Sequence, residues 1–378
     1  NYFVGRYGQM TLSSAGRLFQ PTNQFEPGSA EAINLADEIS RSFLILDDGQ
    51  DINACGDNPV PVPYLGGPPP AVIRAGDTVS ELVGVLDYGQ INTAACYSST
   101  TLEGRDYRLH PTQPPAFTPV NDRTAMPDDV GGRLKVASFN VLNYFLTLDS
   151  RGATTEAELA RQTDKIGAAL EAMDADVVGL MEIENDAGQS MAYLVEKVNE
   201  VMGVGTYDYI DTGLVGTDEI KVGFIYKTTS VTPDGAHAIL DDPAFVDPNN
   251  SGRDRNRPAV AQTFLENDTG ARFTAVVNHL KSKGSSCGLG DDDSTTGQGN
   301  CNLTRTMAAQ ALADWLATDP TGSGDPDVLI IGDLNAYAMD DPITTLTGNG
   351  YTNLLLSLLG DYAYSYIFDG MPGYLDHA

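Results

Sequence analysis

The sequence predicts a layered α/β domain of about 245 residues, preceded by a smaller β-rich domain. The first observation is a change in the hydrophobic pattern near residue 133, after which apolar runs of strand length are mixed with longer stretches of helical period. The second is that the earlier part is broken at short intervals by Gly, Pro and Asp clusters. A chain of 378 residues is long enough for two domains with separate cores.

The first domain is expected over residues 1–130. Short runs with strand character occur at 42–46 and 79–86, which predicts a small barrel or sandwich. The proline-rich stretches 59–63 and 66–70 exclude helix and central strand. The proline-rich tract 110–127 is predicted to be a semi-extended linker to the second domain.

The second domain is expected over residues 131–378, and its elements follow from apolar period and propensity. The predicted strands are 134–141, 176–180, 221–226, 273–277 and 328–331. The predicted helices are 156–173, 191–202 and 305–317.

Composition limits the environment of the protein. The net charge is −30, with 38 Asp, 14 Glu and only 7 Lys, which predicts a strongly hydrated surface suited to a saline medium. Such a charge repels nucleic acid at low salt, and the repulsion weakens as salt shortens the Debye length. No apolar run approaches the roughly 20 residues that span a bilayer. Because the chain starts at Asn1 and shows no signal peptide, we expect a mature or truncated piece of a larger protein.

Four cysteines lie in loop-like, Gly- and Asp-rich surroundings: Cys55, Cys96, Cys287 and Cys301. They form no Cys-x-x-Cys pair, which argues against a zinc site. Pairing within each region predicts the disulfides Cys55–Cys96 and Cys287–Cys301 and an oxidising compartment, with free buried thiols as the alternative. The acidic run 291–293 offers a Ca²⁺ site, but its spacing is not that of an EF-hand, so a solvated acidic loop is favoured.

The stretch 328–337 is the main candidate for chemistry. Four apolar residues of a buried strand stop at Gly332, and Asp333 and Asn335 follow two apart. Positions i and i+2 of an extended chain point to the same side, so a carboxylate and an amide would emerge together. Such oxygens suit Mg²⁺, Mn²⁺ or Ca²⁺. The alternative is an ordinary turn, which Asp and Asn also favour.

Other strand ends carry similar groups. Asn140 ends the strand 134–141, and Glu182 and Glu184 follow the buried run 177–181 on one side of the chain. A glutamate next to a buried strand needs a cation, a hydrogen-bond donor or water. The alternatives are a turn or cap for Asn140 and a solvated loop for the glutamates.

Basic groups accompany a further strand end. His279, one of only four histidines, is followed by Lys281 and Lys283, and could protonate a leaving group or bind a phosphoryl oxygen while the lysines attract phosphate. Three arginines occur between Arg253 and Arg257, and arginine suits bidentate phosphate contacts. A structural histidine and a self-paired surface loop are the alternatives.

Five motifs taken together resemble the endonuclease/exonuclease/phosphatase superfamily, which has the DNase I-like fold. The matching motifs, in order, are Phe139-Asn140, Leu180-Met181-Glu182, Asn278-His279, Gly332-Asp333-Leu334-Asn335 and Leu375-Asp376. They cover roughly residues 133–378, and the phrase 278–284 looks most like secreted bacterial nucleases of the ExeM/NucH type. The resemblance implies a four-layer sandwich, in which two mixed sheets pack face to face with helices outside.

The resemblance also implies site roles. Asn140, Glu182 and Asp333 would hold Mg²⁺ or Mn²⁺, and Asp333 with Asn335 would position the attacking water and the phosphate. His279 would donate a hydrogen bond or proton, and Arg257 would contact the phosphate backbone. Asp376 would orient a second catalytic histidine, which the family carries in a Ser-Asp-His motif. The chain has no such motif, so this histidine and a last metal-ligand Asp are expected beyond residue 378, and His377 is not expected to replace it.

The expected function is that of a secreted, divalent-metal-dependent nuclease acting on extracellular DNA, with RNA as a further substrate. The protein is expected to be a monomer that does not bind membranes. One alternative is a phosphoesterase of the same fold that acts on small phosphoesters or phospholipids. The other is a non-catalytic extracellular protein with structural Ca²⁺.

Overall fold

A computed structural model describes residues 8–14, 16–49, 73–91, 105–121, 123–288, 290–368 and 370–378. These residues fall into two compact units, each assembled from more than one stretch of chain. Unit 1 takes the described residues within Asn1–Pro21, Ser29–Thr124 and Tyr364–Gly373. Unit 2 takes those within Thr22–Gly28, Ala125–Ala363 and Tyr374–Ala378. The expected domains 1–130 and 131–378 were continuous, whereas both units include stretches from either side of that boundary.

Unit 1 contains a four-stranded sheet in the order β1-β2-β5-β4. Its strands are β1 (Gln9–Ser13), β2 (Phe43–Asp47), β4 (Gly84–Gln90) and β5 (Arg105–Pro111). Two two-stranded sheets belong to the same unit: β3 (Thr78–Ser80) pairs with β6 (Ala116–Thr118), and β16 (Tyr366–Phe368) pairs with β17 (Met371–Gly373). Helix α3 (Ala30–Ser42) begins where the Ser29 side chain accepts a hydrogen bond from Ala32 N, and it leads directly into β2. The β-rich prediction did not include this helix.

The expected linker 110–127 is wrong in its first half. Strand β5 extends through Pro111, and β6 pairs with β3 in antiparallel register. Farther along, the Asp77 carboxylate accepts hydrogen bonds from the backbone N–H groups of Val120 and Asn121. The proline-rich tract therefore contains the end of a central strand, the short strand β6 and a segment held by hydrogen bonds, rather than a free connection.

Unit 2 is built on two sheets. The first has the order β7-β8-β10-β9, with β7 (Val136–Tyr144), β8 (Val177–Glu184), β9 (Tyr207–Tyr209) and β10 (Ile220–Lys227). The second has the order β11-β13-β14-β15-β18, and β12 also pairs with β13. Its strands are β11 (Val231–Pro233), β12 (Ala238–Leu240), β13 (Arg257–Glu266), β14 (Arg272–His279), β15 (Val328–Asp333) and β18 (Asp376–His377).

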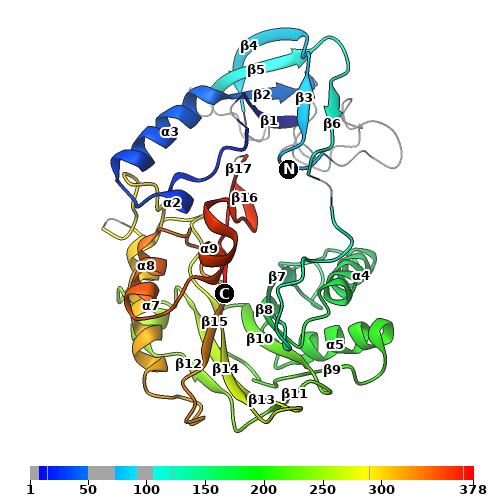
Figure 1. Ribbon diagram of the computed structural model, residues 1–378, viewed down its shortest axis with the longest axis vertical. Coiled ribbons are helices and arrows are strands. Elements are labelled where there is room, and N and C mark those ends of the chain that lie inside the picture. Colours follow the sequence, from blue (N-terminus) through cyan, green and yellow to red (C-terminus); the bar gives the residue numbers. More distant parts are fainter. Residues whose placement is uncertain are drawn as a thin grey trace. The chain divides into compact units, whose positions relative to one another are not determined.

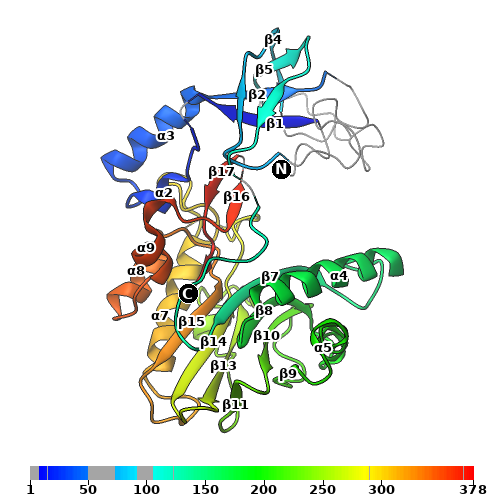
Figure 2. The same cartoon turned by 45° about the vertical axis from the view of Figure 1, so that its right-hand side comes forward.

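Helices cover the outer faces of both sheets (Figures 1 and 2). On one side lie α4 (Glu156–Met173) and α5 (Gln189–Met202), and on the other α6 (Pro243–Val246), α7 (Asn302–Leu316) and α8 (Asp341–Gly348). The remaining helices are α2 (Pro21–Gln24), α9 (Leu354–Leu359) and the 3-10 turn Gly360–Tyr362. Among the helices of the described residues, none combines the length and the apolar character that a membrane span requires.

Three apolar clusters show why unit 2 has four layers. One lies between α4, α5 and the first sheet, and another between α6, α7, α8 and the second sheet. The third joins the inner faces of both sheets and contains Phe224 of β10 and Phe264 of β13, whose rings lie 5.8 Å apart. Gly179 permits this close approach, because a Cβ there would lie 2.6 Å from Ile331. The predicted helix/sheet/sheet/helix sandwich is therefore confirmed.

Candidate active site

Polar side chains from both sheets meet where the strands end. His279 of β14 lies beside Asp333 of β15 in parallel register, and Asp376 of β18 lies beside Asp333 on its other side. In the first sheet, Asn140 of β7 is paired with the residue that precedes Glu182 of β8. The packing of the two sheets brings these ends together, which neither sheet could do alone.

Asn140 connects the two sheets. Its side-chain Nδ2 donates to Glu182 Oε1 at 3.1 Å and to Asp333 Oδ2 at 3.3 Å. Its Oδ1 accepts from the backbone N–H of Leu142 at 2.9 Å, which fixes the orientation of the amide. One amide nitrogen therefore holds two carboxylates from different sheets on the same side of the molecule. Asn140, Glu182 and Asp333, which the resemblance places around one cation, are therefore in contact with one another through Asn140.

The backbone around this point is locally unusual. Glu182 has a φ of 65° and Leu142 a φ of 57°, both in the left-handed region that residues with a Cβ seldom adopt. The pairing of β8 with β10 shifts register next to Glu182, so a bulge turns its side chain toward Asn140. Backbone strain of this kind clusters at functional sites.

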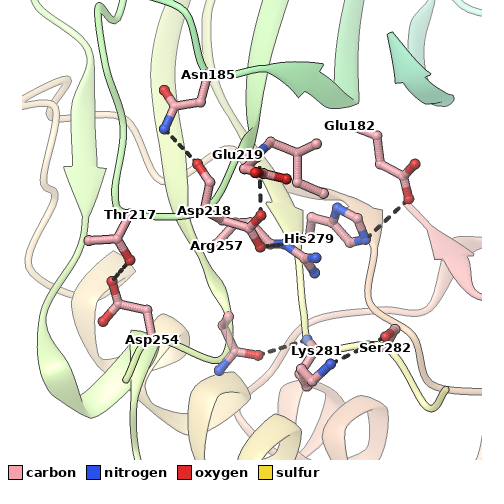
Figure 3. Close-up of polar contacts among 12 residues, drawn as sticks. Glu182, Asn185, Thr217, Asp218, Glu219, Asp254, Arg257, His279, Lys281 and Ser282 are labelled. Carbon is pink, nitrogen blue, oxygen red and sulfur yellow. Dashed lines mark hydrogen bonds and ion pairs between the residues drawn. The ribbon is translucent and has the colours of Figure 1, made fainter. Parts of the chain in front are cut away.

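His279 lies against the same two carboxylates. Its Nε2 is 3.9 Å from Glu182 Oε1 and 3.8 Å from Asp333 Oδ2, and the side chain is 3% exposed (Figure 3). Burial lowers the pKa of His279 well below its usual value, and the positive charges of Arg257 and Arg151 act in the same direction. His279 Nδ1 is buried and has no hydrogen-bond partner among the described residues. The imidazole is therefore neutral, with one N–H to donate.

Asp333 is crowded by negative charge. Burial raises the pKa of the Asp333 carboxyl, and the neighbouring carboxylates of Asp376 and Glu182 raise it further. Hydrogen bonds from the Asn335 backbone N–H and from Asn140 oppose this shift without cancelling it. A cation at this position would relieve the repulsion between the carboxylates.

The residues fit a hard divalent ion in part. Glu182 and Asp333 present carboxylate oxygens to one point, which are the ligands that Mg²⁺ and Mn²⁺ prefer. Asn140 faces them with its NH₂ group, and its oxygen is used by Leu142, so its expected role as a third ligand stays a prediction. Within the described residues, no group of three His, Cys, Asp or Glu side chains is arranged to hold a metal.

Asn335 holds a different position from the one expected. Strand β15 ends at Asp333, and Asn335 has a φ of 48°, so the rule that i and i+2 share a side does not apply. Its Nδ2 donates to the Leu280 carbonyl at 3.0 Å, and its backbone N–H donates to Asp333 Oδ1 at 2.9 Å. Asn335 therefore ties the turn after β15 to the end of β14 and orients Asp333.

His377 is part of the interior. Its Nε2 donates to the Ala336 carbonyl at 2.8 Å, and its ring packs 4.9 Å from that of Tyr374. Burial lowers the pKa of His377 to about 4, so the ring is neutral. These contacts hold His377 in the interior, and the expectation that it does not replace the second catalytic histidine stays a prediction.

The three basic residues expected to contact substrate differ in their surroundings. Arg257 is paired in register with His279 and donates through Nε to Asp218 Oδ2 at 2.9 Å. Lys281 Nζ reaches the hydroxyl of Ser285 at 3.1 Å. Lys283 Nζ is bound to the buried Asp340 at 2.6 Å, which is an internal ion pair instead of the expected phosphate contact.

The loop before α7 is closed by the expected disulfide between Cys287 and Cys301. The carboxylates of the acidic run inside this loop accept hydrogen bonds from backbone N–H groups of the protein itself. Asp291 accepts from the Thr304 N–H at the start of α7, Asp292 from the Cys287 and Cys301 N–H groups, and Asp293 from the Thr295 and Thr296 N–H groups. These carboxylates stabilise the conformation of the loop through hydrogen bonds, whereas the sequence analysis considered them as ligands of Ca²⁺. Cys55 and Cys96 lie outside the described residues.

Sequence reasoning missed Asp218, which binds Arg257, and Arg151, which binds Asp218. Asp218 accepts from Arg257 and also from Arg151 Nη1 at 3.0 Å. No motif marked either residue, because each stands in a loop whose position depends on the packing of the two sheets. The only available signal was the Asp218-Glu219 pair directly before the predicted strand 221–226.

Comparison with known proteins settles the family. A model of the Endonuclease/Exonuclease/phosphatase family matches residues 137–378. The chain belongs to this family. Its matched region contains all five motifs from Phe139 to Asp376 and the whole strand-end cluster. Among curated proteins, no significant match is found. The ExeM/NucH subtype stays a prediction.

Several solved structures align with part of this chain at low sequence identity. The human Nocturnin catalytic domain with bound sulfate aligns at 16% identity and a TM-score of 0.43, covering 65% of this chain and 81% of that one. A mannosyl-6-phosphatase of Bacteroides thetaiotaomicron VPI-5482 aligns at 17% identity and a TM-score of 0.45, covering 65% and 84%. D. rerio TDP2 complexed with a single-strand DNA product aligns at 15% identity and a TM-score of 0.40, covering 65% and 82%. At these values the likeness carries no argument about substrate.

Proposed function

We propose that this protein is a secreted, divalent-metal-dependent nuclease that hydrolyses phosphodiester bonds of DNA. One observation carries the proposal, namely that the Asn140 amide joins Glu182 and Asp333 from different sheets while His279 lies within 4.0 Å of both carboxylates. Carboxylates, an amide and a neutral imidazole gathered at one strand-end site can bind a cation and a phosphoryl group together.

Each side chain has a role in this proposal. Glu182 and Asp333 would hold Mg²⁺ or Mn²⁺, which when bound would polarise a phosphoryl oxygen and stabilise the leaving oxygen. Asp333, oriented by the Asn335 N–H, accepts a hydrogen bond from the attacking water. His279, kept neutral by burial, donates its N–H to the phosphoryl group. Arg257, held by Asp218, binds a phosphate oxygen beside it.

Secretion is supported by the disulfide, because such bonds persist in oxidising compartments. The net charge of −30 suits a salty medium, in which repulsion of a polyanionic substrate is screened. The positive side chains next to His279 offset this repulsion locally.

The test uses the full chain with supercoiled plasmid DNA and Mg²⁺ or Mn²⁺, with and without EDTA. We expect cleavage that EDTA abolishes, and a loss of at least a hundredfold in rate for His279→Ala and Asp333→Ala. Asp327→Ala is the matched control, because Asp327 is exposed and directly precedes the opposite end of β15. Circular dichroism checks the fold of each variant. Undiminished cleavage by correctly folded His279→Ala and Asp333→Ala would reject the assignment.

A further inference from the structure

Basic side chains gather beside His279 in a protein that is otherwise strongly acidic. The positive charges that act on His279 are those of Arg257, Arg151 and Lys281. Those that act on Lys281 are Arg257, Arg255 and Arg253. The acidic groups among them are Asp218, Glu219 and Asp254. Glu182 and Asp333 also lie within 4.0 Å of His279, so basic and acidic side chains are present here in comparable numbers, whereas the whole chain carries −30.

The carboxylate of Asp218 binds two of these cations, Arg257 and Arg151. Asp218 Oδ2 accepts from Arg257 Nε at 2.9 Å, and Asp218 Oδ1 accepts from Arg151 Nη1 at 3.0 Å (Figure 3 shows Asp218 between Arg257 and Glu219). Glu219 lies farther from Arg151, at 3.9 Å. A guanidinium has five N–H donors, so each arginine keeps several that have no partner within the described residues. The pair is therefore fixed in place and still able to bind an anion.

The loop that carries Asp218 is attached to the strand that carries Glu182. Asn185, the residue after β8, donates through Nδ2 to the carbonyl oxygens of Val215 at 2.8 Å and Asp218 at 3.0 Å. Its Oδ1 accepts from the Val215 N–H at 2.9 Å. Three bonds from one amide hold the loop at a fixed distance from the carboxylates. The two arginines are thus positioned relative to the proposed catalytic groups before any substrate binds.

The two arginines differ in the solvent exposure of their side chains. The Arg257 side chain is 8% exposed, and its Nη1 also approaches the Leu280 carbonyl at 3.4 Å, so it serves the interior of the site. The Arg151 side chain is 36% exposed and stands at the outer edge of the pair. A partly exposed ion pair such as Arg151–Asp218 contributes little to stability. A purely structural role would give little reason for Arg151 to occupy this position.

We propose that Arg151 binds a phosphate that flanks the scissile one, beside the phosphate contacted by Arg257. This inference rests on the proposed nuclease function and narrows it. A substrate with at least two consecutive phosphates, a polynucleotide strand, would engage both arginines, whereas a phosphoester with one phosphate would engage Arg257 alone. The paired N–H donors of a guanidinium suit the non-bridging oxygens of a phosphate, and Asp218 fixes the orientation of both guanidinium groups.

The test compares Arg151→Gln with wild type in the full chain. Arg272→Gln is the matched control, because Arg272 Nε also donates to an aspartate, Asp234, but lies at the opposite end of β14 from His279. Binding of a fluorescein-labelled single-stranded DNA 12-mer is measured by anisotropy in EDTA across a salt series. Hydrolysis of an unlabelled 12-mer and of bis(p-nitrophenyl) phosphate, which has one phosphate, is measured with Mg²⁺ or Mn²⁺.

For Arg151→Gln we expect roughly tenfold weaker binding at low salt and a salt slope reduced by about 0.7, the value for one contact to a single strand. KM for the 12-mer should rise by a similar factor, while hydrolysis of bis(p-nitrophenyl) phosphate should match wild type. Arg151→Lys should keep the salt slope and lose part of the affinity, because the charge remains and the fork is lost. Arg272→Gln should behave as wild type in every measurement.

The proposal is overturned if Arg151→Gln has the salt slope and the affinity of Arg272→Gln, or if it slows both substrates equally. Failure of the nuclease function gives a different result, in which wild type hydrolyses neither substrate. In that case a reduced salt slope for Arg151→Gln would still support a phosphate-binding Arg151.

Discussion

Replacement of Lys283 by methionine distinguishes two roles for this side chain. The sequence suggests that Lys283 contacts phosphate, whereas the structure places its ammonium 2.6 Å from Asp340 Oδ2 and 4.4 Å from the centre of the Tyr337 ring. Asp340 is fully buried, and its Oδ2 also accepts from the Tyr337 N–H at 2.9 Å. Methionine matches the lysine side chain up to Cε and removes the ammonium group with its charge and donors.

The expected cost follows from the burial of Asp340. Removing one partner of a buried ion pair costs about 3–5 kcal/mol, because the other charge is left without compensation. The fully buried Arg305 exerts an attractive charge on the same region and takes over part of the compensation. We therefore expect the lower end, about 3 kcal/mol, which lowers the melting temperature by roughly 6–12 °C in a domain of this size.

Thermal unfolding of the full chain, followed by circular dichroism, measures this change. Lys197→Met is a matched control, because Lys197 also has an acidic partner at 2.6 Å, Glu200, and an aromatic ring, Tyr193, at 5.5 Å. Its partner is exposed, so its loss should cost less than about 1 kcal/mol. Combining Lys283→Met with Asp340→Asn should recover part of the stability, since no buried charge then remains unpaired.

The KM for DNA and its salt dependence provide the second reading of the same variant. A structural Lys283 predicts a KM within about twofold of wild type at temperatures where the variant is folded. If Lys283→Met melts with wild type but raises KM and reduces the salt slope by about one unit, the lysine contacts phosphate and the assignment to an internal pair is wrong.

Three further predictions concern the surroundings of the site. Cys287→Ser should lower the free energy of unfolding by about 3 kcal/mol for the loop of sequence separation 14, measured by denaturant titration against reduced wild type, which should lose the same amount. Burial alone would raise the pKa of Asp292, but hydrogen bonds from Ser286 and from the Cys287 N–H lower it to about 2. A depressed pKa gives stability that is present above the ordinary value of 3.8 and is lost as the pH falls through about 2. Asp292→Asn should therefore abolish this acid dependence of the melting temperature in a pH series of melts. An unchanged pH profile would contradict this role of Asp292. Gly332→Ala should destabilise unit 2 and displace Asp333, because Gly332 has a φ of 130° and a Cβ would lie 2.1 Å from the Asn278 carbonyl oxygen; normal melting and normal cleavage together would refute this.

Much of unit 2 could be read from local patterns. Strand β8 is buried on both faces, and its continuous apolar run predicts that directly. Helix α4 begins at a capping box formed by Thr155 and Glu158, a signal that the sequence carries locally. Strand β13 was missed, although it is the longest strand of the described residues, because its residues read first as an arginine-rich loop and then as a run without clear alternation. That omission hid the pairing of Arg257 with His279.

The sequence by itself determined which chemical groups stand at strand ends, since apolar runs that stop at Asn140, Glu182, His279 and Asp333 are local features. Only the tertiary structure decided which of these groups face one another. The packing of one sheet on the other sets the distance from Asn140 to Asp333, across 193 positions of sequence. It also decided that Lys283 turns inward to Asp340 while Arg151 reaches Asp218, because side-chain partners depend on burial and on distances that residue spacing does not encode.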